Sequence, residues 1–163
     1  MDIAAFNPLL RQTVLSPDGL YRYTLWREFD LTNSRYVMFL PLNPSTADAT
    51  EDDPSVRRMV DFAKRWGFGA MCVGNLFAFR ATEPAVMKEA VDPVGPHNDA
   101  ALLALAGQAS LIVAAWGKDG AFRSRADDVA RLIPNLHCLV RNKDGSPRHP
   151  LYVRAETLPS PYP

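Results

Sequence analysis

Four side chains that can do chemistry lie in the polar segments that follow the apolar runs of this sequence. They are Asn43, Asn75, Trp116 and His149. An amide offers both a donor and an acceptor and can orient a water or a ligand. A histidine outside the core can donate a hydrogen bond to charge that develops on a substrate. These residue types predict a polar binding or catalytic site.

Each polar candidate also has a structural interpretation. Asn43 precedes Pro44, which excludes helical geometry, and its amide either orients a water or ligand or forms an Asx turn. Asn75 is costly to bury unless a ligand edge or neighbouring backbone pairs with it. His149 either acts on a substrate or lies in solvent. Asp48 is a candidate general base, because a carboxylate need only reach one water.

Apolar runs and helical patterns predict the elements that position these groups. Residues 21–27 alternate in the manner of an antiparallel edge strand. Buried strands are predicted at residues 36–42, 70–77, 111–116 and 136–140. A helix capped by Asp53 begins at Pro54 and ends at Gly67, and two further helices are predicted from near Pro96 and over residues 122–132.

The order of these elements predicts an α/β fold of three layers, α/β/α. Its central sheet is mainly parallel, with about four strands and an N-terminal antiparallel edge strand. We expect one domain over residues 1–163, with an extended tail over about residues 158–163. Ligands of open α/β sheets bind outside the carboxyl ends of the strands, so the polar segments are expected to converge there.

Composition narrows the classes of function. Eighteen basic and eighteen acidic residues give a net charge of +0, which argues against nucleic-acid binding by bulk electrostatics. A local basic patch remains at residues 141–149. No apolar stretch reaches the roughly 18 residues of a membrane span, which predicts a cytoplasmic protein without a membrane partner. Cys72 and Cys138 lie in apolar runs, so we expect buried reduced thiols, no metal and no cofactor.

Long motifs of the chain resemble the bacterial and phage family called domain of unknown function 1643. The motifs occupy residues 42–50, 52–58, 75–84, 92–99 and 143–152. The resemblance covers nearly the entire chain from Tyr21 onward, and the family name itself supplies no activity.

More distantly, the sequence resembles the uracil-DNA glycosylase superfamily, whose parallel α/β/α fold places its site at the strand ends. Asn43-Pro44 is similar to the first motif, whose acidic or amide residue positions the attacking water. Asn75 corresponds to the asparagine that reads the base edge. His149-Pro150-Leu151 resembles the final motif, whose histidine faces the base oxygen. The last motif here lacks the serine that follows His-Pro in those enzymes.

This resemblance implies a uracil-DNA-glycosylase-like domain that recognises, and in its catalytic form excises, a modified or damaged nucleobase, as an N-glycosylase-type hydrolase. Two alternatives stay open: a non-catalytic module that binds a nucleotide or modified base, and an enzyme that acts on free nucleotides. The expected partner is DNA or a nucleotide, and the oligomeric state is left open. By role, the candidates are catalytic Asn43, Asp48 and His149; substrate-binding Ser45, Asn75, Phe77, Arg80 and Trp116; and phosphate-binding Arg141, Lys143 and Arg148.

Overall fold

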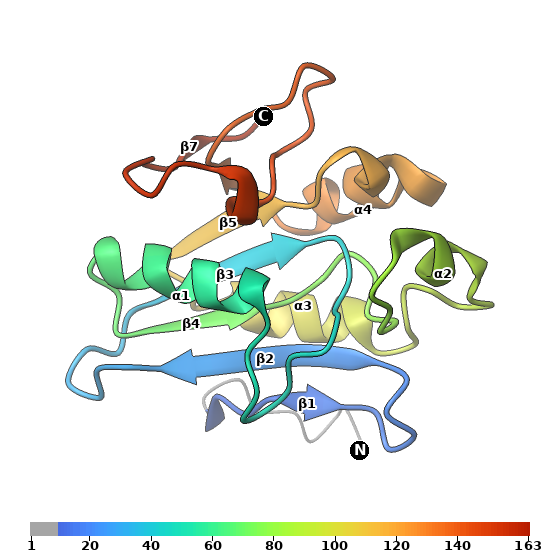
Figure 1. Ribbon diagram of the computed structural model, residues 1–163, viewed down its shortest axis with the longest axis horizontal. Helices are drawn as coiled ribbons and strands as arrows, with labels where there is room; N and C mark the ends of the chain where they lie inside the picture. Colours follow the sequence, from blue (N-terminus) through green and yellow to red (C-terminus); the bar gives the residue numbers. More distant parts are fainter. Residues whose placement is uncertain (1–9) are drawn as a thin grey trace.

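The central apolar run forms β3, the middle strand of a mixed sheet in the computed structural model, which describes residues 10–163 (Figure 1). Parallel strands β4 and β5 lie on its two sides and β6 follows β5, so the parallel core has four strands. β2 pairs antiparallel with β4, and β1 and β7 form antiparallel edges. The seven strands are β1 (Val14–Leu15), β2 (Arg22–Glu28), β3 (Tyr36–Pro41), β4 (Ala70–Val73), β5 (Leu111–Ala115), β6 (His137–Cys138) and β7 (Ser160–Pro161).

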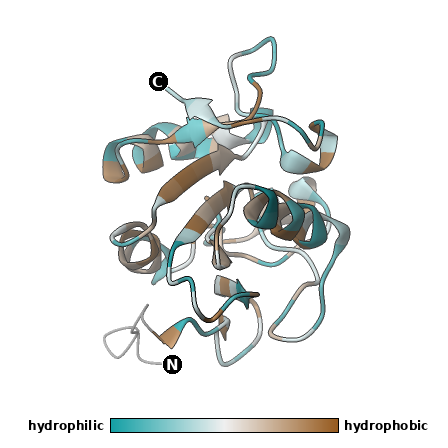
Figure 2. Ribbon diagram, turned by 90° about the vertical axis from the view of Figure 1, so that its left-hand side faces the viewer, coloured by the Kyte–Doolittle hydropathy of each residue, from teal (hydrophilic) through white to brown (hydrophobic). Residues whose placement is uncertain are grey.

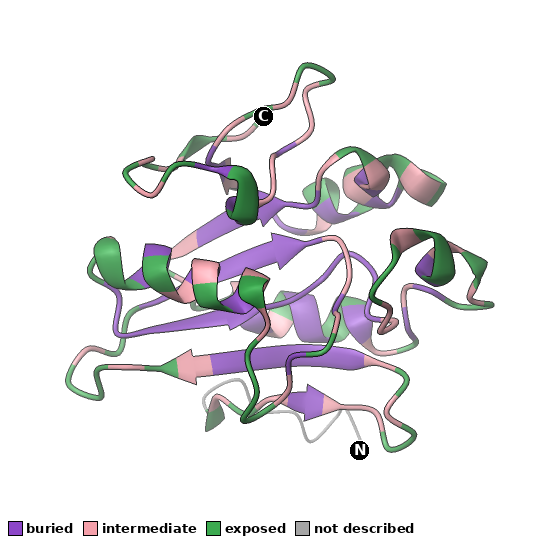
Figure 3. Ribbon diagram, in the orientation of Figure 1, coloured by how far each residue is buried: buried purple, intermediate pink, exposed green. Residues whose placement is uncertain are grey.

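Helices cover both faces of this sheet, as its edge-on view shows (Figure 2). Side chains along β3 alternate between the two faces: Val37 and Phe39 join the apolar cluster under α1, whereas Met38 and Leu40 join the cluster under α3 and α4. The core strands are therefore buried on both sides (Figure 3). Within residues 10–163 the four α-helices are α1 (Pro54–Arg65), α2 (Pro84–Glu89), α3 (Asn98–Ala106) and α4 (Arg125–Leu132).

Helix α1 begins and ends at the predicted signals. Asp53 is its N-cap and accepts a hydrogen bond from the Val56 N–H at 2.9 Å, and Pro54 occupies the first turn. Gly67, just past its end, has a φ of +82°, the left-handed conformation that glycine adopts most readily. The start of α1 lies at the carboxyl ends of the parallel strands, near the end of β3 (Figure 1).

Several predicted boundaries were wrong. The strand predicted at residues 70–77 ends at Val73, and the strand at residues 21–27 is not an edge strand, because β1 lies outside it. The extended tail also contributes an exposed edge strand that was not predicted, β7, which pairs with β6. The last helix begins three residues later than predicted, because Arg123 and Ser124 take left-handed φ angles of 53° and 55°. Helix α2 and the 3₁₀ segments η3 (Lys118–Ser124) and η4 (Pro150–Tyr152) were not predicted.

Both cysteines are buried and free, as expected. Among the residues that the structure describes, no helix is long and apolar enough to cross a membrane.

The chain that leaves β4 stays inside the protein and is anchored by two side chains of the following helices. Asn98 donates from Nδ2 to the carbonyl oxygens of Asn75 at 2.9 Å and Leu76 at 3.1 Å. Arg125 donates from Nε to the Leu76 carbonyl at 2.8 Å and pairs with Asp99 at 2.6 Å. Buried carbonyl groups without a donor are costly, so these contacts fix the backbone on which Asn75 is mounted.

We predict that Asn98→Asp destabilises the protein by at least about 2 kcal/mol, because it keeps the shape of the side chain but sets an acceptor against two buried carbonyl oxygens. Urea unfolding measures the loss. Asn33→Asp is the matched control: Asn33 also donates to a carbonyl, that of Gly67, but it lies in an exposed loop. If the two variants lose equal stability, the anchoring role assigned to Asn98 is wrong.

Candidate functional site

A small polar cavity lies at the carboxyl ends of β3 and β4, against the first turn of α1. Its volume is about 50 Å³, enough for a few waters at about 10–15 Å³ each and well below the roughly 300–1,000 Å³ of most ligand pockets. The structure brings four of the predicted residues together here, namely Asn43, Ser45, Asn75 and His149. The other lining residues are Arg22, Pro41, Asp53, Ser55, Val56 and Met59.

Asn75 is the most unusual side chain of this cavity. It is 1% exposed, and neither Oδ1 nor Nδ2 has a hydrogen-bond partner among residues 10–163. Its backbone carbonyl is held by Asn98, so the side chain is mounted on a fixed segment. A buried amide with both atoms unsatisfied is costly and rare in native proteins, and a ligand edge in the cavity would satisfy it.

Asn43 joins two loops as well as lining the cavity. Its Nδ2 donates to the Ala81 carbonyl at 2.8 Å and to the Pro44 carbonyl at 3.2 Å. The Pro44 carbonyl also accepts the N–H of Ala81 at 3.0 Å. Because both donor positions face carbonyl oxygens, the group that Asn43 can offer to a ligand or water is its acceptor, Oδ1.

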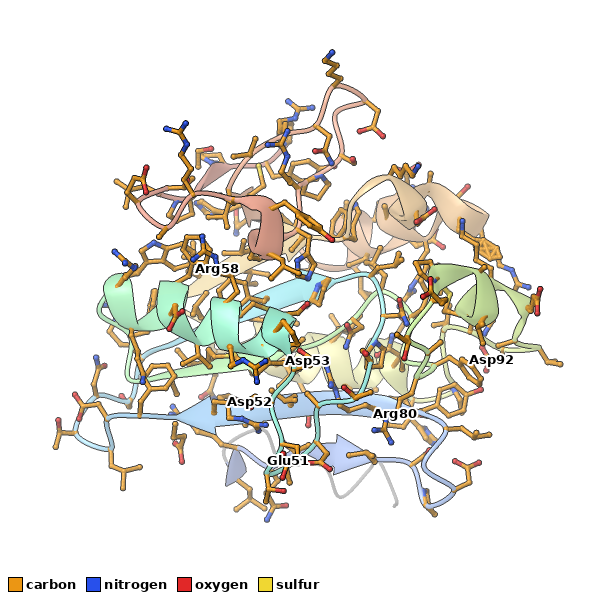
Figure 4. All side chains as sticks on the ribbon, in the orientation of Figure 1. Glu51, Asp52, Asp53, Arg58, Arg80 and Asp92 are labelled. Carbon is orange, nitrogen blue, oxygen red and sulfur yellow. The ribbon has the colours of Figure 1, made fainter. Side chains whose placement is uncertain are left out.

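His149 presents one ring nitrogen to its own backbone and leaves the other for a ligand. It is the N-cap of η4, and Nδ1 accepts the Leu151 N–H at 3.0 Å, so the neutral ring carries its proton on Nε2. Burial lowers the pKa of His149 to about 4, against the opposing charge of Asp53. At neutral pH the ring is therefore an uncharged donor. Arg58, labelled in Figure 4, holds this segment through the carbonyls of Pro150 and Val153.

Arg22 was missed as a site residue by the sequence analysis. It is 3% exposed, its Nη1 donates to the Ala47 carbonyl at 2.8 Å, and its Nε has no partner among the described residues. Burial lowers its pKa to about 10, so it still carries a positive charge at neutral pH. Strand alternation could not have found it, because Tyr23 and Leu25, two residues apart on β2, join apolar clusters on opposite faces of the sheet.

Asp53 was read only as a helix cap, yet its carboxylate also lines the cavity. One of its oxygens accepts the Val56 N–H, and its charge acts on both Arg22 and His149. Figure 4 labels it at the start of α1, with Asp52 and Glu51 earlier in the same loop. No group of three or more His, Cys, Asp or Glu side chains within residues 10–163 is placed to hold a metal ion.

Three predicted residues of neighbouring segments lie outside the cavity. Asp48 accepts the N–H groups of Glu51 at 2.8 Å and Thr50 at 2.9 Å within its own turn, and these hydrogen bonds lower its pKa. Phe77 is fully buried in the core. Arg80 donates to the Gly19 carbonyl at 3.3 Å, next to β2.

The remaining candidates lie toward the other edge of the sheet, where the chain leaves β5 and β6. Trp116 and Arg141 line a second, polar pocket of about 500 Å³. Arg148 donates to Asn142 Oδ1 at 2.9 Å and so stabilises the loop, whereas Lys143 is exposed on it. Arg141 is exposed as well, although it donates to the Gly145 carbonyl at 3.3 Å, so the basic loop has two solvent-facing charges, Arg141 and Lys143.

A family model matches most of the chain. The model of the family described as "Protein of unknown function (DUF1643)" matches residues 22–151. The chain belongs to this family. The match spans every residue that lines the small cavity, from Arg22 to His149. No curated protein and no solved structure matches the chain, so the resemblance to uracil-DNA glycosylases stays a hypothesis.

The neutral state of His149 makes the stability of the fold depend on pH. Its pKa falls from 6.5 to about 4 on folding, so the unfolded chain takes up a proton first, and the stability present above about pH 6.5 is lost as pH falls toward about 4. We expect this loss to approach roughly 3 kcal/mol. Urea unfolding across this pH range measures it.

His149→Asn is the control, because its Oδ1 can still accept the Leu151 N–H but has no proton to bind. This variant should lack the His149 part of the acid-dependent loss. An imidazole of His149 that titrates near pH 6.5 by NMR would contradict the prediction.

Proposed function

We propose that this domain recognises the polar edge of a nucleobase and hydrolyses the N-glycosidic bond that joins the base to its sugar. The observation that carries the proposal is the Asn75 amide, which is buried, has no partner for either polar atom within residues 10–163, and lines the same cavity as His149. Enzymes that act on a base take it out of the stack and read its edge in a closely fitting pocket.

The amide and the imidazole are complementary to a lactam edge. Asn75 can donate from Nδ2 to a ring carbonyl and accept a ring N–H at Oδ1, while the Nε2–H of His149 can donate to a second carbonyl. Both groups are held by backbone contacts, Asn75 through Asn98 and His149 through Leu151. Little reorganisation is then needed when charge develops on the base.

The chemistry that this arrangement favours is departure of the base as an anion. A neutral histidine donor stabilises negative charge on a base oxygen without having to give up its proton. The acceptor Oδ1 of Asn43 can orient a water in the same cavity. Because the cavity measures about 50 Å³, entry of more than the edge of a ring requires the loop between Asn43 and Asp53, residues 44–52, to move outward.

A second candidate function is a module that binds the base or nucleotide without cleaving it. One observation favours it. The Nδ2 group of Asn43 donates to the Ala81 and Pro44 carbonyls, so Asn43 joins two loops in addition to lining the cavity. In this case phosphate binding depends on the two exposed charges of the basic loop, Arg141 and Lys143, because Arg148 is engaged with Asn142.

We predict that Asn75→Leu raises the stability of the ligand-free protein by about 1 kcal/mol or more while it abolishes nucleobase binding. The leucine replaces two buried polar atoms that each cost about 1–3 kcal/mol when unsatisfied. Urea unfolding gives the stability, and calorimetric titration with uracil and with 3-methyluracil, whose edge is blocked, gives the binding.

Gln108→Leu, which removes an exposed amide far from the cavity, is the control and should change neither quantity. The proposal fails if wild type binds uracil no better than 3-methyluracil, or if Asn75→Leu still binds uracil.

The salt dependence of binding separates nucleic acid from a free nucleotide as the substrate. For a deoxyuridine-containing single strand we expect a steep fall of affinity with salt, and Lys143→Ala should reduce the slope by about 1, since it removes one phosphate contact. Deoxyuridine monophosphate should show a shallow slope in both proteins. Arg65→Ala, in the last turn of α1 at the opposite end of the sheet, is the control. Equal slopes for both ligands would favour the free nucleotide.

A further inference from the structure

Hydrolysis of a glycosidic bond needs a group that accepts the proton of the attacking water. Asp48, the carboxylate that the sequence suggested, is committed to its own turn and does not line the cavity. Asn43 does line it, but an amide is a poor proton acceptor. Among the lining residues the carboxylate is that of Asp53.

Two features place Asp53 in a functional rather than a merely structural position. The Val56 N–H takes one oxygen and fixes the orientation of the carboxylate, which leaves the second oxygen for another partner. Across the cavity lie two buried side chains with unsatisfied polar atoms, the Asn75 amide and the Arg22 Nε. Arg22 and Asp53 lie within electrostatic range but form no salt bridge among the described residues. The cavity between them has room for water.

We propose that Asp53 is the general base of this site and takes the proton of the attacking water. The inference rests on the proposed function, in that it names the residue that starts the same hydrolysis. Asp53 is then a catalytic residue, Asn43 orients the same water through Oδ1, and Arg22 is a positioning residue whose positive charge faces the carboxylate.

The step balances without any further reactant. The water oxygen forms a bond to the anomeric carbon of the sugar as the bond from that carbon to the base nitrogen breaks. The electron pair of the broken bond leaves with the base, and the His149 Nε2–H donates a hydrogen bond to the oxygen where the negative charge gathers. The proton of the water passes to Asp53 and then, through solvent, to the departed base.

The variant Asp53→Asn tests this role without removing the cap. Asparagine caps a helix as well as aspartate does, so α1 and the shape of the cavity are kept while the proton acceptor is lost. On oligonucleotides that carry uracil or hypoxanthine, we expect single-turnover cleavage to fall about 100-fold or more. The affinity for the free base should stay within about threefold, because the contacts to its edge come from Asn75 and His149.

Asp52→Asn is the matched control. Asp52 precedes Asp53 in the loop and pairs with Arg27 at 2.7 Å outside the cavity. The Oδ1 of an asparagine still accepts the Arg27 hydrogen bond, so the loop is held as before and both cleavage and binding should be unchanged. Thermal unfolding of the two variants checks that each is folded.

The outcomes separate this inference from the function on which it rests. Cleavage by Asp53→Asn at the wild-type rate overturns the role of Asp53 and leaves the hydrolytic function standing. Equal loss of binding and cleavage makes Asp53 a binding residue and also overturns it. A wild type that binds uracil and cleaves none of the oligonucleotides overturns both the inference and hydrolysis, while base recognition stands. A wild type that does not bind uracil overturns the proposed function itself.

Discussion

The backbone of Asn75 and Leu76 leaves the sheet inside the protein, and its carbonyl groups must find donors there. In a longer strand these carbonyls would bond to a neighbouring strand, but β4 ends at Val73. Asn98 and Arg125 supply the donors, from α3 and α4. The packing of these helices therefore fixes the chain that follows β4, and the side chain of Asn75 lines the cavity with its own carbonyl already satisfied.

The charges at this end of the sheet are arranged around the same cavity. A buried arginine is destabilising unless a partner or ligand compensates it, and Arg22 has a carbonyl partner and a facing carboxylate rather than a direct ion pair. Arg27, five residues further along β2, does form an ion pair, with Asp52, and holds the loop of residues 48–52. Arg27 thus holds the loop of residues 48–52 against β2, whereas Arg22 lines the cavity.

Local signals in the sequence were sufficient for those features that depend on local interactions. The Asp53–Pro54 start and the Gly67 end of α1, and the fully apolar β3, follow from capping and burial within a few residues. The strands β1 and β7 have two residues each, too few for a periodic pattern, and they exist because of pairing with distant segments. The strand β6 was predicted from the apolar run at residues 136–140, but its pairing is limited to His137–Cys138. Arg22 meets Ala47 across 25 residues, a contact that no local pattern carries.

The sequence predicted that the polar segments converge at the strand ends. Some of these residues share the small cavity and others line the second pocket, and the order of the strands in the sheet explains why. β3 and β4 are neighbours, so Asn43 and Asn75 line one cavity, whereas β6 lies three strand spacings from β4, about 14 Å at about 4.8 Å each. Trp116 and Arg141, which follow β5 and β6 closely, line the second pocket.

His149 reaches the cavity because the chain turns back after the basic loop. Pro147 crosses the end of β5, where its carbonyl accepts the Gly117 N–H at 2.9 Å, and Arg58 of α1 then holds Pro150. The histidine is thus delivered by a returning loop and not by its own strand, so its place in the site depends on α1, the helix whose first residue is preceded by Asp53.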